Sequence, residues 1–264
     1  KHIVMNIDKN SRPLILDGGF GSTLEGLNIN VNDSDMWSFD AVLDSPKTVF
    51  AVHQKFIEAG AQVILSNTYH AAVELVMKSR KMKEGDAVAA IWGAVDIAKN
   101  VARQYHKIQV VGSMGPYAIV FRDGSEYSGH YINTMCHKTI SSYYKKQMDI
   151  MLATGLEWFA LETVPTLKEA KIALDVWKSL PASRNKKIWI SFNCKDFQYT
   201  CGGDLFADCV KQFSTENCLS AIGINCTAPD DILPLVTSGF PYAKGKPFVV
   251  YPNHGEKYNV ETQE

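Results

Sequence analysis

The sequence lacks an apolar segment long enough to cross a bilayer, and it lacks an excess of charge of either sign. No run of about 18 uncharged apolar residues occurs in its 264 residues. The 27 Lys and Arg residues nearly balance the 28 Asp and Glu residues, for a formal net charge of −1. We therefore expect neither a nucleic-acid partner nor an anionic membrane partner. With 46% hydrophobic residues, the chain is also too apolar to be disordered.

The chain also lacks the cysteine spacings of a self-contained metal or redox site. Its six cysteines form neither a C-x-x-C motif nor an adjacent pair. A chain of this length can bury a core large enough to fold without disulfides, so we expect reduced thiols. The first residues show no apolar segment of a secretory signal. These absences favour a soluble, cytoplasmic enzyme or binding protein.

Seven short apolar runs recur along the chain, with segments of helical periodicity between them. Continuous apolar runs are typical of strands that are buried on both faces of a parallel sheet. No proline-rich or low-complexity linker interrupts the alternation, so residues 1–264 are predicted to form a single domain. The predicted strands span residues 14–19, 63–68, 109–115, 158–164, 188–194, 221–227 and 248–253.

Several of the predicted helices have recognisable ends. Ser45 and Pro46 are typical of the first positions of a helix, which Gly60 would end. Thr166 and Glu169 have the spacing of a capping box, in which the threonine and the glutamate each bond the backbone N–H of the other. Large side chains on the apolar stripes of these helices are expected in the core: His53, Trp92 and Trp177.

Strands that alternate with helices along the whole chain predict an α/β fold with a parallel sheet. A closed (β/α)8 barrel, the TIM barrel, is the expected architecture, since such barrels typically occupy about 250 residues. A doubly wound open sheet is the alternative, and it usually carries a G-x-G-x-x-G turn that the segment 18–23 lacks. Seven predicted strands are one fewer than barrel closure needs. We therefore expect the eighth strand and a C-terminal segment to be missing from this chain.

Each predicted strand ends in small or polar residues, at the edge where β/α folds bind ligands. Such residues also tie down loops, and a single one would mean little. Seven strand ends that converge on one rim predict a polar pocket. These ends are residues 17–19, 66–69, 113–116, 162–163, 191–194, 225–227 and 251–254.

Two acidic residues at these ends interrupt apolar strands, where a carboxylate is costly to desolvate unless it is paired. Asp17 either caps the following turn or binds a ligand. Residues 22–25 have the spacing of a capping box, so Gly18 and Gly19 are predicted to present N–H groups to an anion near a helix start. Glu162 lies within Ala-Leu-Glu-Thr-Val. With Asp17 it suits either an ammonium group or a general acid and base.

Cys226 differs from the other cysteines because it ends a predicted strand at this rim. Cys209 instead lies at core spacing with Leu205 and Phe213 on a predicted helix. A single strand-end thiol is more often inert than functional, because cysteine is a common buried residue. The pattern alone leaves the role of Cys226 open.

Short motifs at these strand ends follow one another in a fixed order. They are ILDGGFG at 15–21, SNTY at 66–69, GSMGPY at 112–117, DGSEY at 123–127, ALET at 160–163, WISF at 189–192, GINCT at 223–227 and VVYPN at 249–253. In this order they resemble the homocysteine S-methyltransferase family over nearly the whole chain. The segment 123–127 is most similar to the branch that uses S-methylmethionine or S-adenosylmethionine, and less so to the betaine- or cobalamin-dependent branches.

The resemblance implies a (β/α)8 barrel enzyme that transfers a methyl group from a sulfonium donor to the thiol of homocysteine, giving methionine, or to the selenol of selenocysteine. It implies zinc as cofactor, held by three cysteine thiolates, with the homocysteine sulfur in the open position. A free thiol, with a pKa of about 8.5, is mostly protonated at neutral pH, and coordination to zinc delivers it as a thiolate.

The resemblance also assigns roles to single residues by position. Cys226 is implied as a zinc ligand, and Asn225 as the neighbour that orients it. Residues near homocysteine are implied as well: Asp17 and Glu162 at its amino group, and Gly18, Gly19 and Ser191 at its carboxylate. The segment 117–131 either covers the donor, whose cation suits ring faces and carboxylates, or is an ordinary surface loop.

One part of the family pattern is missing. In the family, the other two zinc ligands are adjacent cysteines at the eighth strand, and this sequence has no such pair. We expect them beyond Glu264; otherwise the molecule cannot assemble the site. Cys194 and His254 lie at strand ends and are the alternative ligands.

Two other functions stay open at this point. The glycine-rich first turn also suits a phosphate-handling barrel such as an aldolase. A barrel that keeps the amino-acid pocket without the metal would be a binding protein.

Overall fold

The computed structural model describes residues 13–253, which fall into two units. The first unit comprises residues 13–114 and 153–158, and the second comprises residues 115–152 and 159–253. Each is described by itself. No helix among the described residues is long and apolar enough to cross a membrane.

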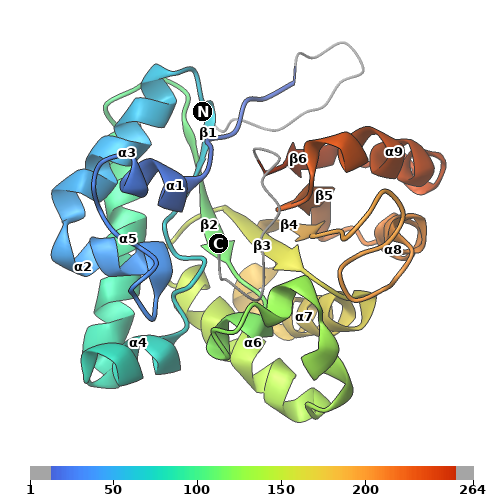
Figure 1. The fold of residues 1–264 in the computed structure, drawn as a ribbon, viewed down its shortest axis with the longest axis horizontal. Coiled ribbons are helices and arrows are strands. Elements are labelled where there is room, and N and C mark those ends of the chain that lie inside the picture. The colour runs from blue at the N-terminus through green and yellow to red at the C-terminus, as the bar shows by residue number, and fades with distance from the viewer. Residues whose placement is uncertain (1–12, 254–264) are drawn as a thin grey trace. The chain divides into compact units, whose positions relative to one another are not determined.

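The first unit pairs two parallel strands and surrounds them with helices. Strand β1 lies parallel to β2, in a register that sets Ile64 opposite Val110. Helix α5 packs against α3 and α4, as the blue and teal ribbons of Figure 1 show. The elements are α1 (Phe20–Glu25), α2 (Asp40–Asp44), α3 (Pro46–Glu58), β1 (Val63–Leu65), α4 (Val73–Arg80), α5 (Glu84–Ala102) and β2 (Gln109–Met114), with a 3-10 turn at Trp37–Phe39.

The first predicted strand, residues 14–19, is reduced to a single bridge. Leu16 pairs in parallel with Val63, and the N–H of Asp17 donates to the Val63 carbonyl at 2.9 Å. Helix α1 begins directly afterwards, at Phe20, which leaves no length for a longer ladder. The predicted capping box at residues 22–25 is wrong, because those residues lie inside α1 rather than before it.

The second unit contains strands in the order β3-β4-β5-β6, and the pairs β4–β5 and β5–β6 are parallel. Helix α6 packs on α7, and α8 packs on α9 (Figure 1). The elements are α6 (His137–Leu152), β3 (Trp158–Val164, with Trp158 in the first unit), α7 (Leu167–Ser179), β4 (Lys187–Phe192), α8 (Phe206–Phe213), β5 (Leu219–Asn225), α9 (Pro229–Gly239) and β6 (Phe248–Tyr251). Short 3-10 turns lie at Tyr117–Val120 (η2), Ser125–Tyr127 (η3), His130–Asn133 (η4), Pro181–Ser183 and Phe240–Tyr242.

The predicted α/β fold with parallel strands is confirmed, and every residue of β3 is buried, as a strand covered on both faces requires. Closure into an eight-stranded barrel and the single domain over 1–264 stay predictions. Helix α3 begins with Ser45 and Pro46 as expected. His53 and Trp177 lie in the core, but the expectation for Trp92 is wrong, since 41% of it is exposed. The buried stripe of α5 runs through other positions and leaves Trp92 at its edge.

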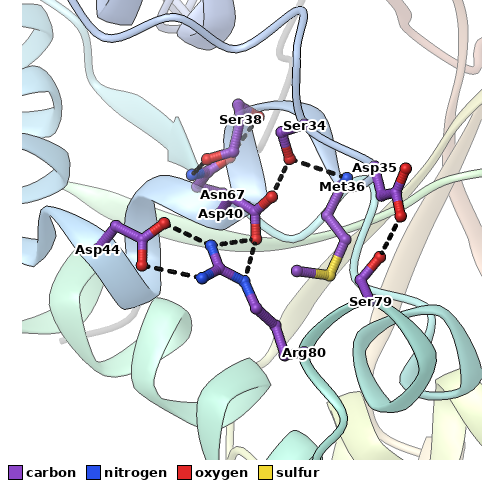
Figure 2. Close-up of polar contacts among 9 residues, drawn as sticks. All are labelled: Ser34, Asp35, Met36, Ser38, Asp40, Asp44, Asn67, Ser79 and Arg80. Carbon is purple, nitrogen blue, oxygen red and sulfur yellow. Dashed lines mark hydrogen bonds and ion pairs between the residues drawn. The ribbon is translucent and has the colours of Figure 1, made fainter.

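A charged network holds α4 against α2 in the first unit (Figure 2). The guanidinium of Arg80 donates from Nε to Asp40 at 2.7 Å and from a terminal nitrogen to Asp44 at 3.0 Å. Ser34 donates in turn to Asp40. Because Asp40 and Arg80 are both largely shielded from water, this network fixes two helices and needs no ligand to complete it.

Glu169 has a different role from the one its sequence context predicts. Thr166 caps α7 as expected, accepting from the Glu169 N–H at 3.1 Å. The Glu169 side chain, fully buried, instead accepts from the Tyr117 N–H and the Tyr144 hydroxyl, both at 2.7 Å, and from the Tyr131 hydroxyl. Burial raises the pKa of Glu169, and these donors oppose that shift. The carboxyl thereby ties the segment around η2 and η4 to α7.

Removing this carboxyl should destabilise the second unit. Glu169→Ala would leave three buried donors unpaired, so we expect the free energy of unfolding to fall by about 3–5 kcal/mol. Glu169→Gln keeps one acceptor oxygen and should lose only about 1–2 kcal/mol. Denaturant unfolding of the two variants measures the difference, and equal midpoints for both would contradict this account.

His53 should make stability fall in mild acid. Both of its ring nitrogens are buried without a hydrogen-bond partner among the described residues, and burial lowers its pKa to about 3. In the unfolded chain His53 has an ordinary histidine pKa of about 6.5, so below that pH it binds a proton that it does not bind in the folded state. Between pH 7 and pH 5 the wild type should therefore lose about 2 kcal/mol relative to His53→Leu. Urea unfolding at both pH values tests this, with exposed His106→Leu as the control that keeps the wild-type pH dependence.

Candidate functional site

Strands β4, β5 and β6 present one shared face in the second unit. The register pairs Ser191 with Gly223 and Asn225 with Tyr251, so alternate residues of neighbouring strands lie side by side. On this face the Tyr251 hydroxyl lies 2.6 Å from the Ser191 hydroxyl and accepts from the Trp189 indole N–H at 3.3 Å. Tyr251 on β6 thus reaches across β5 to two residues of β4.

Gly223 makes that reach possible. A Cβ built at this position would lie 2.7 Å from the Ser191 Cβ and 2.8 Å from the Val249 carbonyl oxygen, both too close for real atoms. Only glycine therefore lets β4, β5 and β6 approach one another here while Ser191 keeps its hydrogen bond.

Glu162 comes from β3 and joins this group. It is 7% exposed, and its carboxyl is hydrogen-bonded to Tyr251. Burial raises the pKa of Tyr251 well above its ordinary value, and the charge of Glu162 adds to that effect. The phenol therefore keeps its proton. The indole of Trp189 can only donate a hydrogen bond. The Tyr251 hydroxyl is therefore free to donate its own hydrogen bond to an acceptor, and Glu162 is one.

Cys226 lies at the end of β5 within a tight set of hydrogen bonds. Asn225 Nδ2 is 3.2 Å from the Cys226 Sγ and donates to Thr163 Oγ1 at 2.7 Å. Asn225 Oδ1 accepts from the Thr163 N–H at 2.9 Å, and the Thr163 hydroxyl points at the same sulfur from 3.8 Å. One buried amide therefore joins the ends of β3 and β5 and orients the thiol.

The backbone at this place is strained. Thr163 has φ 58° and Cys226 has φ 48°, both in the left-handed region. That region is unusual for any residue with a side chain and most of all for a β-branched one. Such outliers cluster at functional sites, where the surrounding structure enforces them. Here the two bonds of Asn225 to Thr163 supply the enforcement.

The Cys226 thiol is protonated at neutral pH when it has no further partner. Burial raises its pKa to about 11; the neighbouring acids, Glu162 and Glu126, add to the rise, and its two hydrogen-bond donors oppose it. Burial likewise raises the pKa of Cys209, whose structural role in the core of α8 is confirmed. A bound cation would be required to hold Cys226 as a thiolate.

The described residues fit one position of a metal site and not a full set. Residues 13–253 contain no group of three His, Cys, Asp or Glu side chains that could hold a metal ion. Cys226, with two donors aimed at its sulfur, has the chemistry of a thiolate ligand. Cys194, the alternative ligand, is buried and belongs to no such group, and His254 lies outside the described residues.

The strand ends of the first unit are used differently. Asp17 accepts from the Leu65 N–H at 2.8 Å, a bond to β1 that neither the capping of the following turn nor the ligand-binding alternative predicts. Asn67 exchanges two hydrogen bonds with Ser38, and Thr68 donates to the Ser113 carbonyl at 2.7 Å (Figure 2 shows the Asn67 pair). These side chains tie loops together.

The predicted site residues thus fall into two groups. The structure brings Glu162, Ser191, Asn225 and Cys226 into the second unit, and it places Asp17, Gly18 and Gly19 in the first. The binding roles of the first-unit residues stay predictions. The sequence analysis missed Thr163, Trp189 and Tyr251, although each lies beside a residue that it had singled out or within a strand-end motif.

Parallel strands alternating with helices, and a strand-end thiol held by an asparagine, define a β/α protein with an enzyme-like site. Sequence comparison gives the family: the profile described as Homocysteine S-methyltransferase matches residues 14–264. The chain belongs to the homocysteine S-methyltransferase family, a family of enzymes.

Individual relatives agree with this assignment. The chain is 33% identical to the Betaine-homocysteine S-methyltransferase of Drosophila melanogaster, over 95% of this chain and 82% of that one. It is 30% identical to the Homocysteine S-methyltransferase YbgG of Bacillus subtilis, over 95% and 80%. The structure matches the metallated form of the Homocysteine Methyltransferase MmuM from Escherichia coli with a TM-score of 0.81 at 27% identity, over 97% of this chain and 88% of that one.

Substitutions at Asn225 should show how far it supports this site. Asn225→Leu removes the acceptor of the buried Thr163 N–H, so we expect a loss of about 2–3 kcal/mol in unfolding free energy. Asn225→Asp keeps that acceptor and should lose clearly less. Denaturant unfolding compares the two, and an Asp variant as unstable as the Leu variant would argue against the bridging role.

Proposed function

We propose that this protein transfers a methyl group from a sulfonium donor, S-methylmethionine or S-adenosylmethionine, to the thiol of homocysteine, giving methionine. Selenocysteine is the alternative acceptor. The observation that carries the proposal is the Cys226 thiol, held by Asn225 and Thr163 at the end of a strand in a chain of this family. Both substrates are small molecules, and we infer that the protein works in the cytoplasm as a single (β/α)8 barrel domain.

The reaction is a displacement at carbon. A lone pair of the homocysteine sulfur forms a bond to the donor's methyl carbon while the bond from that carbon to the sulfonium sulfur breaks. The leaving electron pair neutralises the sulfonium, and the acceptor thiol gives up its proton. Two neutral thioethers result, so the difficulty lies in presenting the acceptor as a thiolate at neutral pH.

We propose that Cys226 is one ligand of a zinc ion. Bound zinc would supply the acceptor sulfur as a thiolate without a dedicated base. The residues of this chain act around that centre. Asn225 donates to the Cys226 sulfur and so orients it, and Thr163 adds a second, longer contact.

The same face offers groups for the amino-acid part of homocysteine. Glu162 is buried, and its carboxyl is positioned by Tyr251, which is itself held by Trp189 and Ser191. A carboxylate fixed in this way suits the substrate ammonium group. Ser191 would serve the substrate carboxylate through its hydroxyl.

The test is methionine formation by the full-length, zinc-loaded protein from homocysteine and each donor in turn, betaine included. Cys226→Ser should lower both turnover and zinc content, with turnover falling about a hundredfold or more. Cys136→Ser, which alters an exposed thiol, should change neither. If betaine were the only donor to give turnover, the methyl donor would be a quaternary ammonium compound and not a sulfonium. Failure of the wild type with every donor would refute the proposal.

A further inference from the structure

Asn193 carries a buried acceptor without a partner. It follows β4, has no solvent exposure, and donates from Nδ2 to the backbone oxygen of Glu126 at 2.7 Å. Its Oδ1 is buried and accepts no hydrogen bond from any described residue. Turning the amide over would place oxygen against the Glu126 oxygen, so the donor must face Glu126 and the acceptor must stay free. Such an atom costs stability unless a ligand supplies a donor.

Its place in the sheet puts this acceptor beside the proposed metal ligand. The β4–β5 register ends with Phe192 opposite Ile224, and Asn193 and Asn225 are the residues that directly follow this last pair. Asn193 shares its face with Ser191, two residues earlier on the strand. The unpaired oxygen therefore belongs to the same rim as Cys226.

Glu126 brings negative charge to that rim. It is half-buried in η3, and no Lys, Arg or His forms an ion pair with it in the described part of the chain. Burial raises its pKa, and Asp123 adds to the rise. Its charge also acts on the Cys226 thiol. A carboxyl without a cationic partner, on a residue whose backbone oxygen is bonded by the amide that carries the unpaired oxygen, has the chemistry of a cation site.

Glu126 does not sit on a loose loop. Glu169 holds η2 and η4 on either side of it, and Lys168 donates to the Ile132 carbonyl at 2.9 Å. Gly129 packs so closely that a Cβ there would lie 2.8 Å from the Thr166 methyl. The backbone that carries Glu126 is therefore fixed before any ligand arrives, which is what a specific subsite needs.

We propose that Glu126 and the Oδ1 of Asn193 form the subsite for the α-ammonium group of the methyl donor. An ammonium satisfies both needs at once, because it carries positive charge and N–H donors, whereas a sulfonium carries only the charge. The inference rests on the proposed function and deepens it. It assigns the donor's ammonium to Glu126, separately from the homocysteine ammonium at Glu162.

The test measures binding by calorimetry, independently of turnover. The probes are S-methylmethionine, S-adenosylmethionine and 4-(dimethylsulfonio)butanoate, which is S-methylmethionine without its amino group. The wild type should bind S-methylmethionine about tenfold or more tightly than the analogue. Glu126→Gln and Asn193→Leu should weaken the binding of S-methylmethionine by a similar factor and leave the binding of the analogue unchanged. Asp208→Asn, an exposed acid on α8, is the charge-matched control and should change neither.

Three other outcomes overturn the assignment, and two concern the proposed function as well. Equal weakening of both probes by Glu126→Gln would mean that the carboxyl recognises the sulfonium. A raised KM for homocysteine with unchanged donor binding would mean that these residues bind homocysteine and not the methyl donor. Unchanged binding of all probes in both variants, with wild-type melting temperatures, would remove these residues from recognition. Donor binding as expected without methionine formation would refute the proposed function and leave the subsite supported, while no binding of either donor would refute both.

Discussion

The amide of Asn225 is the interaction on which the rest of the candidate site depends. Strand ends in a parallel sheet have no covalent connection to one another, and their last backbone groups are free to fray. Asn225 joins β5 to β3 by bonding both the N–H and the hydroxyl of Thr163, and its remaining contact turns the Cys226 sulfur into place. The left-handed backbone at Thr163 and Cys226 is held by this side chain together with the bond from the Cys226 N–H to the Tyr251 carbonyl.

Much of the fold and part of the site followed from the sequence, because both rest on local pattern. Apolar runs gave the strands, and Thr166 gave the cap of α7. Cys226, Asn225, Glu162 and Ser191 share one unit, as strand ends in a parallel sheet should. The failures concern partners far away in the chain. Nothing near Glu169 reveals that its carboxyl receives donors from residues 25 to 52 positions earlier, and nothing near Asp17 reveals its bond to Leu65.

The second unit also shows how charge is distributed around the Cys226 thiol. Two acids, Glu162 and Glu126, act on the same thiol from β3 and from the η3 segment. Glu126 forms no ion pair with a lysine or arginine among the described residues, and Glu162 is hydrogen-bonded to Tyr251. An environment of this kind disfavours a lone thiolate and favours bound cations.

The Glu169 cluster has a consequence for how the chain is made. A ribosome delivers Tyr117, Tyr131 and Tyr144 before the acceptor that all three need, and Tyr117 must wait for 52 further residues. Until α7 emerges, the segment that carries Glu126 lacks its bonds to Glu169 and is held to α6 by Tyr143. The last step in ordering this part of the second unit is therefore the arrival of a single carboxyl that three earlier donors share.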